Sequence, residues 1–136
     1  MNYSGSEKLT RFIFSKSHFS VQNKTVKYGA FIPPPDSEDR SICSPDLSVY
    51  DISGLSESEV WMIGRQYVQG IRSIKARADL SVQDVHSNNL KVTSAPQLHE
   101  RHANITPFPS DRLTCEQIAR RLALASQLVL MRSEEI

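Results

Sequence analysis

The sequence has few of the residues from which most nucleotide-binding motifs are built. Its 136 residues include only five glycines, which are scattered along the chain. No glycine-rich loop precedes a Lys-Ser or Lys-Thr pair, and no dinucleotide-binding fingerprint occurs. No Gly-x-Ser-x-Gly sequence is present, so nothing indicates the nucleophile elbow of the α/β-hydrolases. These absences remove the common phosphate-loop and acyl-transfer motifs, and no cofactor is expected.

Cysteine is also scarce, with only Cys43 and Cys115 in the chain. They form no Cys-x-x-Cys pair, and no Cys/His spacing suits zinc. His99 and His102 could share a metal only on a helix, which the nearby Pro96 argues against. No metal site is therefore predicted. Cys115 falls just inside a predicted helix, whose N-terminus could lower the thiol pKa, although a small residue without a chemical role is the favoured interpretation.

Long apolar runs and excess charge are missing as well. No apolar run approaches the roughly 20 residues that span a bilayer, and the polar first ten residues lack the hydrophobic stretch of a secretory signal. The sequence therefore predicts a cytoplasmic protein with no membrane partner. The formal net charge is +1, from 16 basic and 15 acidic residues. That balance provides no strong field for attracting nucleic acid or anionic lipid.

What is present predicts an α+β domain. Hydrophobic residues make up 39% of the chain, which is ordinary for a globular protein. We expect a small mixed or antiparallel sheet packed by two main helices and one short helix. The chain is divided into a flexible tail at 1–8 and a single globular domain at 9–136, with a proline-rich loop at 33–46. The main helices are placed at about 56–70 and 114–131.

Helix starts give the clearest local signals. Ser56 with Glu59 forms a Ser-x-x-Glu capping box, and Thr114 with Gln117 forms a second box of the same kind. Ser81 with Asp84 predicts a shorter helix. In each case the hydroxyl would accept a hydrogen bond from the N–H three residues on.

Strands are predicted between these helices from strand-favouring residues and alternating polarity. Segments 9–14 and 26–32 are expected to pair antiparallel across a turn at 20–25. Further strands are predicted at 47–52, 75–80, 90–93 and 103–106.

Six polar residues are candidates for handling a phosphate-bearing substrate. His18 and His102 would transfer protons, since two histidines can serve as acid and base without a metal. The anion would be bound by Lys27, Arg77 and Arg101, with Asp79 orienting Arg77. The alternative for Arg77 and Asp79, which are neighbours on one face of a strand, is a surface salt bridge worth about 0–1 kcal/mol.

Aromatic residues between lysines suggest a further possibility, a stacking platform for single-stranded nucleic acid. The competing interpretation places the same aromatics in the core. They are Phe12, Phe14, Phe19, Tyr28 and Phe31, with Lys16, Lys24 and Lys27 among them.

Two functions therefore remain open. The first is an interaction or regulatory protein that binds an unknown protein partner or self-associates through its apolar C-terminal helix. The second is a small metal-independent enzyme or binder acting on a nucleotide or RNA. The absence of a catalytic motif favours the first. The second requires the six polar residues to converge on one cleft.

Overall fold

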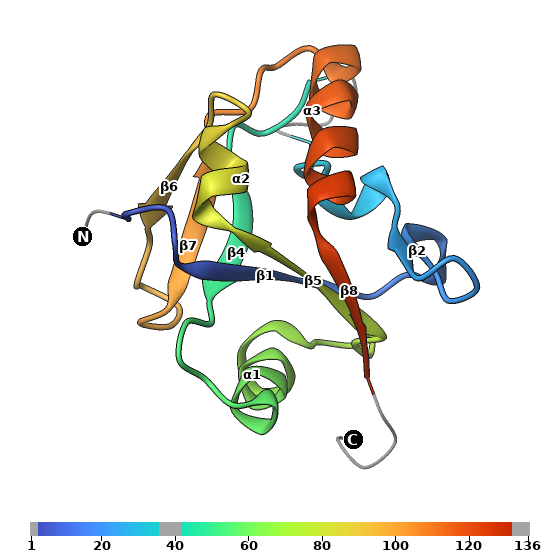
Figure 1. The fold of residues 1–136 in the computed structure, drawn as a ribbon, viewed down its shortest axis with the longest axis vertical. Helices are drawn as coiled ribbons and strands as arrows, with labels where there is room; N and C mark the ends of the chain where they lie inside the picture. The colour runs from blue at the N-terminus through green and yellow to red at the C-terminus, as the bar shows by residue number, and fades with distance from the viewer. Residues whose placement is uncertain (1–2, 36–41, 132–136) are drawn as a thin grey trace.

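The computed structural model describes residues 3–35 and 42–131. Two groups of strands form a six-stranded and a two-stranded antiparallel sheet, and three α-helices accompany them (Figure 1), which confirms the α+β prediction. The strands are β1 (Lys8–Ile13), β2 (Phe19–Ser20), β3 (Thr25–Val26), β4 (Leu47–Asp51), β5 (Ala76–Ser81), β6 (Lys91–Ser94), β7 (His102–Thr106) and β8 (Gln127–Leu130). The α-helices are α1 (Glu57–Ile63), α2 (Val82–His86) and α3 (Arg112–Ala125).

Short helical turns complete the element list. A π-helical turn, η3 (Gly64–Val68), extends α1, so the helix predicted at 56–70 is present in two parts. The turns η1 (Lys16–His18) and η2 (Tyr28–Phe31) are 3₁₀ helices.

The large sheet has the strand order β6-β7-β4-β1-β5-β8, with every neighbouring pair antiparallel. It consists of two halves that cross at a steep angle, with β4 and β7 running across the direction of β1 and β5 (Figure 1). Only two register pairs, Leu9↔Asp51 and Thr10↔Tyr50, join β1 to β4. The sheet is therefore sharply bent at its centre.

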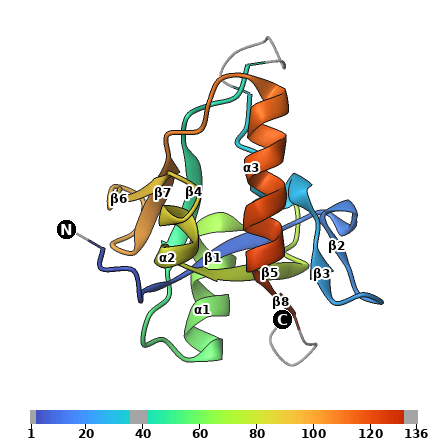
Figure 2. The same ribbon diagram turned by 45° about the horizontal axis from the view of Figure 1, so that its top comes forward.

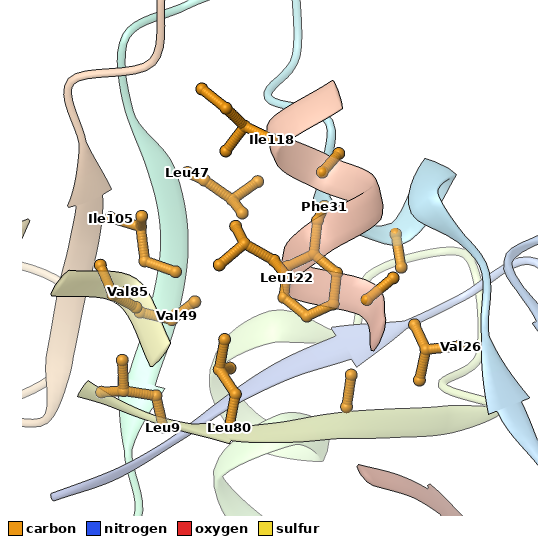
Figure 3. Close-up of a cluster of buried hydrophobic side chains, with 14 of the residues drawn as sticks. Leu9, Val26, Phe31, Leu47, Val49, Leu80, Val85, Ile105, Ile118 and Leu122 are labelled. Carbon is orange, nitrogen blue, oxygen red and sulfur yellow. The ribbon is translucent and has the colours of Figure 1, made fainter. Parts of the chain in front are cut away.

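Helices cover both faces of this sheet (Figure 2). On one face, α2, α3 and η2 enclose the main core, where side chains such as Leu9, Val49 and Leu122 point toward one another (Figure 3). On the opposite face, α1 packs through Trp61 and Val60 against Phe12 of β1. Alternation along each strand explains this division, because successive side chains point to opposite faces.

Two of the three predicted capping boxes are confirmed. The Ser56 hydroxyl accepts from the Glu59 N–H at 3.3 Å, and Ser81 accepts from Asp84 at 3.1 Å, each with the reciprocal carboxylate bond. The Thr114 box is wrong, because the helix begins one turn earlier. Asp111 is the N-cap of α3, and its carboxylate accepts from the Thr114 N–H at 2.9 Å.

The predicted end of the C-terminal helix is also wrong. α3 ends at Ala125, and the following residues form β8 rather than continuing to 131. Leu128 and Val129 pair with Ala78 and Arg77 of β5. Helical spacing of apolar residues cannot reveal this strand, because its hydrogen-bond partner lies about 50 residues away in the sequence.

The predicted pairing of 9–14 with 26–32 is wrong for a similar reason. β1 pairs with β4 and β5, while the short β3 pairs with β2, and the rest of the second segment forms η2. The strands predicted at 47–52, 75–80, 90–93 and 103–106 are confirmed as β4, β5, β6 and β7 within two residues at each end.

The structure describes parts of the predicted tail at 1–8 and of the predicted proline-rich loop at 33–46. Of the tail predicted at 1–8, residues 3–8 are described, and Gly5 and Glu7 accept backbone hydrogen bonds from Gln83 and Val82. Of the proline-rich loop predicted at 33–46, residues 36–41 lie outside the described residues, while Cys43 bonds through its N–H to Ser110. No helix among the described residues has the length and apolar character needed to cross a membrane.

Candidate functional site

The most distinctive geometry of the fold lies where β1 and β4 separate. Beyond Thr10, β1 stays paired with β5 as far as Ile13, and β4 stays paired with β7 as far as Leu47. No register pair joins Arg11–Ile13 to β4. The bend of the sheet therefore opens a gap between two central strands, a place where ligands can reach backbone as well as side-chain groups.

Arg11 occupies this gap. Its Nε donates to the Ala30 carbonyl at 3.1 Å, and one Nη donates to the Ser48 carbonyl at 2.9 Å. No carboxylate forms an ion pair with it among the described residues. Burial lowers the pKa of Arg11 to about 10, which leaves it charged at neutral pH. Because the two bonds use two of the five N–H donors of a guanidinium, the group retains donors for an anion.

A hollow of about 280 Å³ adjoins this guanidinium, and we call it the Arg11 hollow. His18 and Arg72 also line it, as does Asp46, which is exposed. Burial, with the positive charges of Arg11 and Arg72, lowers the pKa of His18. The surroundings of His18 are therefore electropositive, as an anion-binding site requires.

A second hollow of about 190 Å³ shares Arg11, Phe12, Phe14 and Ser48 with the first. We call it the His102 hollow, and the two together the cleft. His102 is 7% exposed, and its ring meets the Tyr50 ring edge-on at 5.2 Å. Its Nδ1 lies 2.8 Å from the Ala95 carbonyl oxygen and its Nε2 lies 3.1 Å from the Ser48 Oγ. The His102 hollow is thus lined by aromatic rings and an imidazole held in place by hydrogen bonds, and it adjoins the basic Arg11 hollow.

The six residues proposed from the sequence do not share one hollow. His18 and His102 line the two halves of the cleft. Lys27 is exposed and lies beside Tyr28 and Arg120 on the α3 side. Arg101 donates to the carbonyls of Asp51 and Ser53 at 3.0 and 3.2 Å, so its guanidinium fastens the chain after β4.

Arg77 and Asp79 are buried beneath α1, so the expected surface salt bridge is wrong. Arg77 is 2% exposed and Asp79 3% exposed. Nε of Arg77 donates to Asp79 at 3.1 Å, and its two Nη atoms donate to the Glu57 carboxylate at 2.9 and 2.8 Å. Its guanidinium also lies 4.8 Å from the Trp61 ring. We call these four residues the Arg77 cluster.

Within the Arg77 cluster, the positive charge of Arg77 is compensated by the carboxylates of Asp79 and Glu57. Burial alone would lower the pKa of Arg77, but hydrogen bonds to Glu57 and Asp79 raise it. Asp79 also accepts a hydrogen bond from the Thr10 hydroxyl at 2.7 Å. Because both carboxylates hold the arginine fork, the cluster fixes α1 to the sheet and leaves little of the guanidinium for a ligand.

The aromatic stacking platform is also not formed. Phe12, Phe19 and Phe31 are 5%, 8% and 0% exposed, and belong to the core. Likewise Cys115 is not an activated thiol, because burial and a hydrogen bond with Cys43 raise its pKa to about 12. Cys43, which has no partner predictable from the sequence, is buried beside it. No group of three or more metal-ligating side chains is found within 3–35 and 42–131.

Sequence reasoning missed three residues of the cleft, namely Arg11, Ser48 and Arg72. One signal was available for Arg11. Arg11 lies two residues from both Leu9 and Ile13, so its side chain points to the same, core-facing side of β1 as theirs. A charged residue at such a position is unusual. Ser48 and Arg72 carry no comparable signal, since serine in a strand and arginine in a loop are both common.

Comparisons with protein-family models, curated proteins and solved structures find no match to this chain. What the cleft does must be inferred from its own residues. These are a partly buried arginine whose side-chain hydrogen bonds, among the described residues, go to carbonyl groups, together with two histidines, a serine and aromatic walls.

Proposed function

We propose that this chain binds a small phosphate-bearing ligand, of the size of a mononucleotide, with the phosphate seated at Arg11, His18 and Arg72. One observation carries the proposal, the partly buried Arg11 guanidinium whose hydrogen-bond partners are carbonyl oxygens. A carbonyl offers a partial negative charge, whereas a phosphate would neutralise the cation and engage its remaining donors.

The size of the cleft supports a small ligand rather than a polymer. Small-molecule sites are typically about 300–1,000 Å³, and each of the two adjoining hollows, at about 280 and 190 Å³, is smaller than that, so the ligand would have to occupy both. The net charge of +1 offers little attraction for a long polyanion. The Phe14 ring, which lines both hollows, would contact the apolar part of the ligand.

Of the six residues expected from the sequence, the proposal retains His18 and His102. We place the protein in the cytoplasm, where the buried thiols of Cys43 and Cys115 would stay reduced. No membrane partner is proposed.

The test is calorimetric titration of the full chain with adenosine monophosphate and with adenosine. We expect the nucleotide to bind and the nucleoside to bind at least ten-fold more weakly. Arg72→Glu should abolish the difference, while Arg121→Glu, which makes the same charge change at an exposed position of α3, should preserve it. Equal affinity for the two compounds, or binding only to oligomeric RNA, would refute the proposal.

Self-association through the C-terminal region is a second candidate. Leu113 and Leu124 of α3 are 70% and 87% exposed, and β8 is an edge strand of the large sheet. Exposed edges and apolar side chains favour pairing with another chain. Light scattering behind a sizing column should show a dimer that Leu124→Lys disrupts; a monomer at all micromolar concentrations would refute it.

A further inference from the structure

The cleft contains a serine hydroxyl held directly against an imidazole. Ser48 Oγ lies 3.1 Å from Nε2 of His102, and Nδ1 of the same ring lies 2.8 Å from the Ala95 carbonyl oxygen. A carbonyl oxygen can only accept a hydrogen bond, so Nδ1 carries the proton. In the neutral form of the ring Nε2 is then unprotonated, and in that form it accepts the hydrogen bond from the Ser48 hydroxyl.

The surroundings fix this orientation. His102 lies on β7 directly opposite Tyr50 on β4, and the two rings are in contact. The ring is buried, whereas Ser48 is exposed and lines both hollows of the cleft. A nucleophile, a base within hydrogen-bond reach and a group that orients the base are the three parts of an activated serine.

Arg11 links this pair to the anion site. One of its Nη atoms donates to the backbone carbonyl of Ser48, so its positive charge lies beside the main chain of the serine. Ser48 also lines the Arg11 hollow together with His18 and Arg72. Positive groups fixed near a nucleophile stabilise the negative charge that develops on phosphoryl oxygens during displacement.

We infer that Ser48 is a nucleophile and His102 its general base, and that the chain cleaves a phosphate diester whose phosphate sits at Arg11; this substrate class rests on the proposed function. Ser48 Oγ attacks the phosphorus as its proton passes to His102 Nε2. The bond from phosphorus to the leaving oxygen breaks, and the leaving alkoxide takes that proton. Water, deprotonated by His102, then attacks the phosphoseryl ester and releases Ser48 with its proton restored.

Other surfaces offer weaker grounds. The Arg77 cluster is closed by its own carboxylates. The buried Cys43 and Cys115 thiols have no access to a substrate. The hollow beside β8 is lined by that strand and by Val21 and Lys24, with nothing to indicate its occupant.

Diisopropyl fluorophosphate tests the inference, since it is a phosphorus electrophile whose fluoride leaves when a serine oxygen attacks. We expect intact-protein mass spectrometry to show a single adduct, and peptide mapping to place it on Ser48. His102→Gln should slow labelling by about 10²-fold or more, the usual contribution of a general base. Ser48→Ala should remove the adduct without unfolding the protein, because the side chain is exposed.

Ser53 is an internal control. Its hydroxyl donates to the Asp51 carboxylate at 2.7 Å, and no imidazole is bonded to it in the part of the chain that the structure describes. Equal labelling of Ser48 and Ser53, or equal rates in the wild type and His102→Gln, would overturn the inference.

Turnover of bis(p-nitrophenyl) phosphate gives a second measurement. We expect p-nitrophenol release by the wild type and none by Ser48→Ala; release that persists in this variant would overturn the role of Ser48. The two proposals can fail separately. Nucleotide binding without labelling would refute the serine mechanism alone, whereas labelling without nucleotide binding would refute the proposed ligand.

Discussion

Arg77 on β5 and Arg11 on β1 lie on neighbouring strands of one sheet, yet their surroundings differ. Arg77 is held by two carboxylates, Asp79 and Glu57, and by the face of Trp61. Arg11 is held by two backbone carbonyls. A buried charge with complete partners stabilises the fold, whereas one with only dipolar partners can still bind an anion. The comparison separates a structural arginine from a functional one.

The largest expected effect comes from breaking the Arg77 cluster. Arg77→Ala leaves the Asp79 carboxylate buried without its counter-ion, which should lower the free energy of unfolding by about 3–5 kcal/mol. Urea denaturation measures this loss. Glu57→Gln is the milder control, because the Glu57 side chain is 63% exposed and Asp79 keeps its arginine. A loss below about 1 kcal/mol for Arg77→Ala would show that the cluster is not structural.

Arg11→Met should have a small effect on stability and a large effect on anion binding. It removes two hydrogen bonds but also a partly buried charge that has no carboxylate partner among the described residues, so we expect a loss of only about 1–2 kcal/mol in stability. The affinity for sulfate, measured by calorimetry, should fall more than ten-fold, which corresponds to a loss of more than about 1.4 kcal/mol in binding free energy. If Arg11→Met costs as much stability as Arg77→Ala and leaves sulfate binding unchanged, the distinction between the two arginines is wrong.

The pH dependence of His18 sharpens the comparison. Burial, Arg11 and Arg72 lower the pKa of His18 in the folded state, while the unfolded chain keeps a value near 6.5. The stability from neutral His18 is therefore complete above the unfolded pKa and is lost as the pH falls through the folded pKa.

Bound sulfate supplies a negative charge that favours the imidazolium. We expect sulfate to bind several-fold more tightly at about pH 5.5 than at about pH 8, because a shift of one pKa unit corresponds to about ten-fold in affinity. Sulfate does not titrate in this range, which isolates the protein contribution. His18→Gln should flatten the profile measured by calorimetry; an unchanged slope would exclude His18 from the site.

Gly29→Ala should have the smallest effect. A Cβ at this position would lie 2.8 Å from Cδ2 of the His18 ring, so the imidazole must shift away from its place in the Arg11 hollow. We expect sulfate affinity to fall by several-fold, with little change in melting temperature, because the displaced group is the end of a side chain. Gly70→Ala is the matched control, since its Cβ would meet nothing within 4 Å. Equal affinities for the two variants would contradict the placement of His18.

The parts of the fold that could be predicted depend on local interactions. The boxes at Ser56 and Ser81 involve residues three apart, so the sequence contains both partners. The strand at Leu47–Asp51 follows a proline-containing loop, and its exposed Ser48 lies between the buried Leu47 and Val49. The Thr114 box failed because Asp111 caps the helix one turn earlier, where its carboxylate accepts from the Thr114 N–H.

The candidate site was predictable only in part. His18 and His102 were identified as polar residues near the ends of strands, and each lines the cleft. Arg77 and Asp79 look in the sequence like an exposed pair, because nothing local indicates that α1 folds over them with Glu57 and Trp61. Ser48 could not be assigned, since its role depends on an imidazole 54 residues away.

By itself, the sequence determined the α+β class, two helix starts and five of the six strands of the large sheet, because these follow from capping, alternation and propensity within short windows. Only the tertiary structure decided that residues 127–130 leave the helical pattern to pair with β5. It also decided that β1 and β4 separate beyond Thr10, which places Arg11, His18, Ser48 and His102 along one cleft. Strand pairing and burial join residues distant in the sequence, and their free energies outweigh local preference.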